Sequence, residues 1–238
     1  MAAERLDRSP WYHTIELPDG RVTPGRWDTR HVASRLPWPE LTGKRCLDVG
    51  TWDGFWAFEM ERRGGLVTAI DVWDPLRWDW PRHADTRTWA EKMRYDGFAV
   101  AREALGSNVD RVECSVYDVE KLGRFDFVFI GTILIHLRDP VGALMAVRDV
   151  TAEVISCDHV SASLSALPYP AANIAGRGEP HWWTPNVRCH KRWLTSAGFT
   201  ILGSGLYRQQ RGPGRGRFTG TLGRLRRAGL PHQWIYAR

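Results

Sequence analysis

The segment Asp48-Val49-Gly50-Thr51-Trp52-Asp53-Gly54 joins a short apolar run to a stretch with helical spacing. A glycine in such a turn lets a ligand approach the backbone closely, and the free N–H groups at a helix start carry partial positive charge. This arrangement suits the carboxylate end of a ligand that contains an amino acid. Gly50 and Gly54 lack the G-x-G-x-x-G spacing of dinucleotide-binding proteins, and some turns of this kind bind nothing.

An acidic residue, Asp71, ends the next apolar run, Leu66–Asp71, about twenty residues after these glycines. A carboxylate at the end of a second strand can accept hydrogen bonds from both hydroxyls of a ribose. The glycine turn and the spaced acid together predict a ligand that contains a nucleoside.

Three histidines are candidates to take a proton from a bound hydroxyl or amine, because histidine titrates near neutral pH. His136 is the first candidate, since it follows the fourth predicted strand, at the edge where ligands of open α/β sheets bind. His13 and His181 are second candidates, because each lies beside tryptophan or tyrosine in a segment that could close over a site. For all three, packing or a bond to the backbone is the alternative role.

These residues depend on a sheet whose strands alternate with helices. The runs that read as strands are Arg45–Val49, Leu66–Asp71, Arg111–Ser115, Asp126–Ile130, Glu153–Asp158, Thr200–Tyr207 and Gln233–Ala237. Helical patterns fill about Thr86 to Leu105, the stretch after Asp139-Pro140, and Lys191–Ala197. The pattern predicts an α/β fold with a Rossmann-like, doubly wound, mostly parallel sheet of seven strands, the last two forming a late antiparallel hairpin.

The chain divides into two parts in this prediction. Residues 1–40 form an aromatic-rich N-terminal segment and a possible lid, and residues 41–238 form the main domain. Within that domain, residues 159–185 and 208–230 are predicted to be insertions or loops. Many of the 13 tryptophans fall outside the predicted strands, where they could form a wall for a planar or glycosidic acceptor or simply cover the sheet edge.

Composition narrows the class of protein. The length of 238 residues with 43% hydrophobic content suits a globular domain, and no apolar run is long enough for a membrane span, so we expect a cytoplasmic protein without a membrane partner. The net charge of +6 reflects arginines after Tyr207. Four separated cysteines and the absence of a His/Cys cluster predict free thiols and no metal site. The oligomeric state is left open.

Taken in order, Leu47–Gly50, Asp71, Tyr117–Val119 and Phe125–Val128 resemble the motif set of class I S-adenosylmethionine-dependent methyltransferases. The resemblance implies S-adenosyl-L-methionine as cofactor, with Asp48 and Gly50 at its methionine part, Asp71 at the ribose and Asp118 beside the adenine amine. The neighbouring positions expected to line the same site are Thr51, Trp52, Val72, Val119 and Gly131. Trp52 stands where a glycine is common, so its ring either packs on the cofactor or narrows the pocket.

A second resemblance, which covers more of the chain but matches it less strictly, is to the tRNA wobble-uridine carboxymethyltransferases. It rests on Leu134–Pro140 and Trp193–Phe199. Those enzymes use a carboxylated S-adenosylmethionine and carry a tyrosine just before the histidine, together with a lysine before the core. Here Ile135 replaces the tyrosine and no lysine precedes Lys44. These departures favour plain S-adenosylmethionine and a different substrate.

The sequence therefore predicts an enzyme that transfers a methyl group to an oxygen of a small-molecule acceptor, with His136, His13 or His181 removing the proton. One alternative is a tRNA-modifying methyl or carboxymethyltransferase, in which the basic connection Arg208–Leu230 would contact phosphates. The other alternative is a non-catalytic scaffold that binds the cofactor without turnover.

Overall fold

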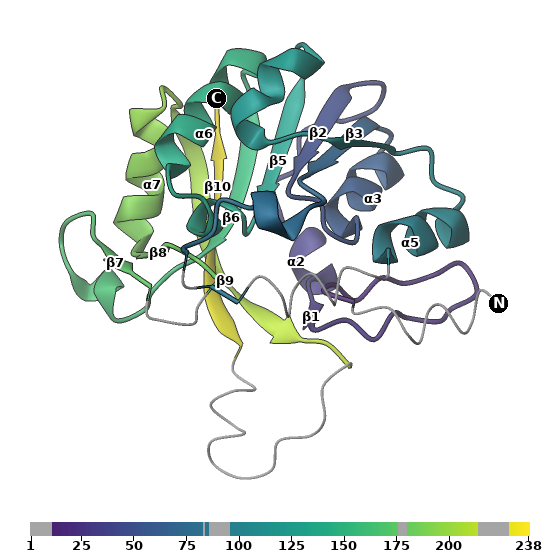
Figure 1. Cartoon of the computed structure of the whole chain (residues 1–238), viewed down its shortest axis with the longest axis horizontal. Helices are drawn as coiled ribbons and strands as arrows, with labels where there is room; N and C mark the ends of the chain where they lie inside the picture. Colours follow the sequence, from purple (N-terminus) through teal and green to yellow (C-terminus); the bar gives the residue numbers. More distant parts are fainter. Residues whose placement is uncertain (1–10, 83, 86–95, 176–179, 214–228) are drawn as a thin grey trace, which may run out of the picture.

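The computed structural model describes residues 11–82, 84–85, 96–175, 180–213 and 229–238. Its centre is an eight-stranded sheet with the order β1-β9-β10-β6-β5-β2-β3-β4 (Figure 1). Five neighbouring strands are parallel; they are β2 (Arg45–Val49), β3 (Leu66–Asp71), β4 (Asp110–Glu113), β5 (Phe127–Gly131) and β6 (Val154–His159). This confirms the predicted mostly parallel α/β sheet.

The late hairpin is confirmed and is longer than predicted. Strands β9 (Ile201–Arg211) and β10 (Leu230–Ala237) pair antiparallel, and β10 also pairs antiparallel with β6. The ladder reaches Gln209 opposite Leu230, so both ends of the predicted loop 208–230 belong to strands. Residues 214–228 of that loop, with most of its arginines, lie outside the described residues.

The prediction of seven strands is wrong by one. The short strand β1 (Trp27–Asp28) pairs antiparallel with Gln210 and Arg211 at the far end of β9 and adds an eighth strand at the edge. A two-residue strand carries no period-two pattern, so only the partner strand reveals it.

Helices cover both faces of the sheet, and alternate residues of β5 show which face they meet. Phe127 and Phe129 point into a core cluster with α3 (Phe55–Arg62), α5 (Gly97–Leu105) and α2 (Arg30–Ala33). Val128 and Ile130 point into the other cluster, with the 3-10 helix η2 (Val116–Leu122), α6 (Pro140–Val150) and α7 (Val187–Ser196). Helix α5 falls within the stretch predicted from Thr86 to Leu105; residues 86–95 of that stretch lie outside the described ones.

The N-terminal segment packs on the first of these faces. Trp11, Ile15 and Leu17 are buried and belong to the same cluster as α3. Residues 159–185 are also more structured than a loop, since they contain the 3-10 helix η4 (Leu164–Ala166) and a two-stranded sheet of β7 (Ala172–Ile174) and β8 (Trp183–Pro185). Within the described residues, no helix is long and apolar enough to cross a membrane.

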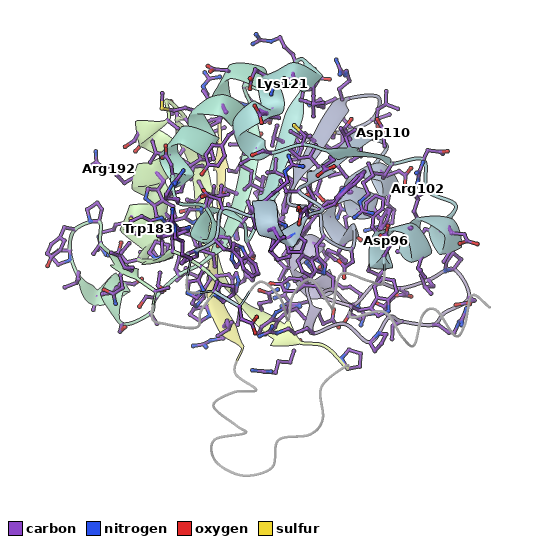
Figure 2. The ribbon with its side chains drawn as sticks, in the orientation of Figure 1. Asp96, Arg102, Asp110, Lys121, Trp183 and Arg192 are labelled. Atoms are coloured by element: carbon purple, nitrogen blue, oxygen red, sulfur yellow. The ribbon has the colours of Figure 1, made fainter. Side chains whose placement is uncertain are left out.

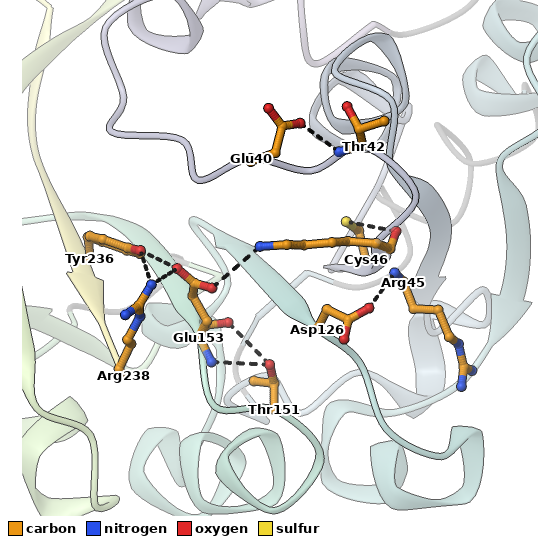
Figure 3. Close-up of polar contacts among 10 residues, drawn as sticks. Glu40, Thr42, Arg45, Cys46, Asp126, Thr151, Glu153, Tyr236 and Arg238 are labelled. Atoms are coloured by element: carbon orange, nitrogen blue, oxygen red, sulfur yellow. Dashed lines mark hydrogen bonds and ion pairs between the residues drawn. The ribbon is translucent and has the colours of Figure 1, made fainter.

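The amino ends of the parallel strands are held by a cluster of polar contacts around Glu153 (Figure 3). Its nearly buried carboxylate accepts a hydrogen bond from the Tyr236 hydroxyl and lies 3.2 Å from a guanidinium nitrogen of Arg238 and 3.9 Å from Nζ of Lys44. These contacts tie β10 and the segment before β2 to the start of β6.

We expect Glu153→Ala to lower the free energy of unfolding by about 2 kcal/mol, because the Tyr236 hydroxyl and two cations lose a buried partner. Glu40→Ala is the control, since Glu40 is exposed and its carboxylate bonds to Thr42, two residues along the chain. Urea unfolding of both variants measures the difference. An equal response of the two variants would contradict the structural role of Glu153.

Candidate functional site

A cavity of about 390 Å³ lies at the carboxyl ends of β2, β3, β4 and β5. At the ends of these four strands and directly after them, it is lined by Gly50 and Trp52, Asp71 and Val72, Cys114 to Tyr117, and Gly131 to Ile133 with His136 to Arg138. The N-terminal segment adds Tyr12 and His13, and the segment after β3 adds residues 77–80. Seven of the residues predicted for the site are therefore brought together: His13, Gly50, Trp52, Asp71, Val72, Gly131 and His136.

The glycine turn after β2 has the backbone that a close-approaching ligand requires. Gly50 has a φ of +74°, and a Cβ added there would come within 3.0 Å of the side chain of Ile133, which also lines the cavity. Trp52 (φ +50°) and Thr132 (φ +54°) also have left-handed backbone, and both line the cavity. Side chains other than glycine rarely adopt this conformation, and such strain concentrates at ligand sites.

Asp71 lies at the end of β3 with its carboxylate fixed by the backbone. One oxygen accepts the N–H of Trp52 at 2.9 Å and the other accepts the N–H of Val72 at 2.8 Å. Each carboxylate oxygen can accept a further hydrogen bond. Burial raises the pKa of Asp71 above its usual value. Two fixed acceptors at the cavity wall fit the two adjacent hydroxyls of a ribose.

Asp48 and Thr51 lie beneath the glycine turn and do not line the cavity. Both are buried, because Asp48 is an internal residue of the central strand β2 and Thr51 follows its end. Burial raises the pKa of Asp48 to about 7. The structure therefore does not bring these two predicted residues to the cavity wall.

The raised pKa of Asp48 predicts the direction in which stability changes with pH. The folded state binds the Asp48 proton more tightly than the unfolded state, so its contribution to stability falls as the pH rises from about 4 to about 7. In Asp48→Asn we expect the drop in unfolding free energy between pH 5 and pH 8 to be smaller than in the wild type by about 1 to 2 kcal/mol. Denaturant unfolding at both pH values measures it, and an equal drop in the two proteins would contradict the assignment.

The structure does not bring Asp118 and Val119 into the cavity. The 3-10 helix η2 turns Asp118 outward, where its carboxylate pairs with Nζ of Lys121 at 2.6 Å, and Val119 is buried in the core. Figure 2 shows Lys121 at the upper end of the molecule, where β10 ends in Figure 1. The residues that line the cavity after β4 are instead Ser115, Val116 and Tyr117. The motif therefore lies at a turn that lines the cavity, although Asp118 and Val119 themselves do not line it.

His136 lines the cavity with its ring orientation fixed. Its Nδ1 donates to the Pro180 carbonyl at 2.7 Å, and the ring stacks on Trp80 with centroids 5.9 Å apart. Burial lowers the pKa of His136 to about 4, so the ring is neutral at pH 7 with the Nε2 lone pair available. His181 does not line the cavity; its ring stands edge-on to His136 at 6.1 Å.

Asp53 is the residue that sequence reasoning missed. It is 2% exposed and binds His13, which precedes it by 40 residues, through an Nδ1 to Oδ1 contact of 2.5 Å. Its place in the glycine turn was visible in the sequence, but no spacing rule pairs it with a histidine so far away.

Aromatic rings form a continuous series along one side of the cavity. Ring centroids are 5.9 Å apart from Tyr12 to Trp52, 5.9 Å from Trp52 to Trp78, and 4.4 Å from Trp78 to Trp80. Trp80 then stacks on His136. The rings of Tyr12, Trp52, Trp78 and Trp80 come from three separate segments, and each is tilted against the next by 44° to 51°. They give the cavity an aromatic wall, which suits a planar or ring-shaped occupant.

The part of the chain that the structure describes holds no group of three or more His, Cys, Asp or Glu side chains that could bind a metal ion.

Comparison with known proteins gives two kinds of likeness, and no family model matches the chain. Over 179 residues the chain is 27% identical to a tRNA U34 carboxymethyltransferase of Ectopseudomonas mendocina, covering 73% of this chain and 49% of that protein. A Pseudomonas aeruginosa protein of the same name is 28% identical over 168 residues, covering 68% and 47%. The chain thus spans about half the length of the curated relatives it matches.

Solved structures resemble the chain over most of its length. The N-terminal domain of EvdMO1, crystallised with S-adenosylhomocysteine and D-fucose, superposes with a TM-score of 0.57 at 17% identity, covering 100% of this chain and 94% of that one. The 1,6-didemethyltoxoflavin-N1-methyltransferase of Burkholderia thailandensis superposes with a TM-score of 0.54 at 17% identity, covering 83% and 71%. With the observed strand order and the cavity at the carboxyl ends of the strands, these likenesses show that the chain has the fold of the class I S-adenosylmethionine-dependent methyltransferases.

Proposed function

We propose that this chain binds S-adenosylmethionine in the cavity and transfers its methyl group to an oxygen of a small-molecule acceptor. The observation that carries the proposal is the pair of fixed oxygens on Asp71 beside the left-handed turn at Gly50, both at one cavity wall. S-adenosylhomocysteine in the solved relatives EvdMO1 and the toxoflavin enzyme supports the same cofactor. When bound, the cofactor supplies a methyl group on a positively charged sulfur.

The residues of the cavity divide into two groups in this proposal. The backbone of Gly50 and Trp52 holds the methionine part, Asp71 accepts the ribose hydroxyls, and Val116 with Tyr117 flanks the adenine. The acceptor lies against the aromatic wall, near His136 and His13. Both groups together order the reactants and exclude water, which is how a methyltransferase achieves most of its rate.

A small acceptor is favoured by the form of the cavity. Its aromatic wall contains Trp52, Trp78 and Trp80. Two solved structures of the same fold were determined with a ring-shaped molecule, D-fucose present in one and 1,6-didemethyltoxoflavin bound in the other. The acceptor atom, the N-terminal lid and the cytoplasmic location predicted from the sequence remain predictions.

Calorimetric titration with S-adenosylmethionine and, separately, with its carboxylated analogue tests the cofactor. We expect the plain cofactor to bind more tightly, because Ile135 is apolar and buried and offers no partner to an added carboxylate. Preference for the analogue would favour carboxymethyl transfer instead. Binding of neither compound would contradict the proposal.

Modification of tRNA is the second candidate, favoured by the names of the curated relatives. It predicts RNA binding that weakens steeply with salt and falls when Arg224, Arg226 and Arg227 are neutralised. These arginines lie outside the described residues. The activity of a small-molecule enzyme should change little with salt or with neutralisation of these arginines. A non-catalytic scaffold would bind the cofactor without methylating any acceptor.

A further inference from the structure

The buried carboxylate of Asp53 joins the glycine turn to the N-terminal segment. One oxygen, Oδ2, accepts the backbone N–H groups of Tyr12 at 2.9 Å and His13 at 2.7 Å. The other, Oδ1, accepts Nδ1–H of the His13 ring at 2.5 Å. Asp53 is 2% exposed, so these contacts form away from bulk water.

The His13 ring is fixed in orientation and in proton position. It stacks on Phe55 with centroids 5.3 Å apart and meets the Tyr12 ring edge-on at 4.8 Å. Because a carboxylate can only accept, the proton of the neutral ring lies on Nδ1 and the Nε2 lone pair is left over. Within the described residues Nε2 has no hydrogen-bond partner, and His13 lines the cavity.

His13 and His136 differ in the group that partners Nδ1 of the ring. The partner of His13 is an anion, which stabilises the positive imidazolium formed when a histidine takes a proton. The partner of His136 is the neutral carbonyl of Pro180, and burial lowers the pKa of His136 to about 4. His136 is therefore better suited to hydrogen-bonding an acceptor than to holding its proton.

We propose that His13, oriented by Asp53, is the general base of the methyl transfer, and that Asp53 is its positioning residue. This proposal rests on the proposed function. The acceptor oxygen bonds to the methyl carbon as the carbon–sulfur bond breaks and its electron pair passes to sulfur. The hydroxyl proton passes to Nε2 of His13, and later to water.

Diethyl pyrocarbonate tests where Nε2 points, because it acylates only an unprotonated ring nitrogen, and peptide mass spectrometry locates the product. We expect His13 to react in the free protein and to react at least about tenfold more slowly with saturating sinefungin, an analogue whose amine occupies the place of the methyl group. Free N-acetylhistidine in the same solution reports the reagent concentration. We expect His13→Gln to bind sinefungin with an affinity within about threefold of the wild type, measured by calorimetry, because the His13 side chain is proposed to face the acceptor and not to hold the cofactor.

Asp53→Asn tests the orienting role with little change of shape. Its carbonyl must stay at the Oδ2 place, because two backbone N–H groups point there, so its NH₂ faces Nδ1 of His13. We expect ¹⁵N spectra to show the His13 proton moved to Nε2, and acylation of His13 to slow by about tenfold or more. His136 in the same variant should react as in the wild type.

The outcomes separate the two proposals. If sinefungin and S-adenosylmethionine both fail to bind the wild type, the proposed function falls and the role of His13 falls with it. If sinefungin binds but leaves His13 as reactive as before, or if Asp53→Asn keeps the proton on Nδ1, the role of His13 and Asp53 is overturned while cofactor binding stands.

Discussion

Asp71→Ala should weaken the binding of S-adenosylhomocysteine by roughly a hundredfold, because two hydrogen bonds to a charged acceptor are worth about 3 kcal/mol together. The carboxylate is held by the N–H groups of Trp52 and Val72, so its oxygens need no reorganisation when a ribose arrives. Calorimetry on the wild type and the variant measures the loss.

Asp118→Ala is the matched control for this experiment. Its carboxylate pairs with Lys121 on the surface, away from the cavity, although the sequence motif places it beside the adenine. We expect its affinity to stay within about twofold of the wild type. An Asp71 variant that binds as well as the Asp118 variant would remove Asp71 from the site.

The second large effect is expected for Gly50→Ala. The new methyl group would lie 3.0 Å from the Ile133 side chain, and a shift of Ile133 away from it would crowd the cavity beside the turn, where the methionine part of the cofactor is proposed to lie. Crowding of this kind costs about 2 kcal/mol, so S-adenosylhomocysteine should bind roughly 30-fold more weakly.

Gly43→Ala separates crowding from backbone strain. Gly43 has nearly the same φ, +70°, but a Cβ there meets no atom within 4 Å. Both variants should lose about 1 kcal/mol of unfolding free energy through the left-handed backbone, and Gly50→Ala should lose more through its contact with Ile133. Only Gly50→Ala should lose affinity, and an equal loss of affinity in the two variants would show that the close approach at Gly50 is unimportant.

Part of the site follows from the sequence because it depends on local order along the chain. In a parallel sheet the carboxyl ends of strands meet at one edge, so the turn at Gly50, the acid Asp71 and the loop with His136 had to lie near one another once the strands were identified. The same alternation of apolar runs predicted the five parallel strands and the late hairpin.

Other features could not be predicted from local pattern, because they depend on rotation within a turn or on a distant partner strand. The motif Tyr117-Asp118-Val119 occurs at the expected place, but the 3-10 helix η2 presents Tyr117 to the cavity and turns Asp118 to solvent. Strand β1 has two residues and no periodicity, and it exists only because β9 extends to Arg211.

The sequence by itself determined the fold class, the edge of the sheet where the cavity lies, and Asp71 and Gly50 at that edge. These follow from periodicity, glycine geometry and strand order, which are properties of neighbouring residues. Only the tertiary structure decided which residues meet across long separations in the sequence. His13 pairs with Asp53, and Tyr12, Trp78 and Trp80 join one aromatic series. Such contacts arise when separate segments pack against one core, and no short-range pattern specifies them.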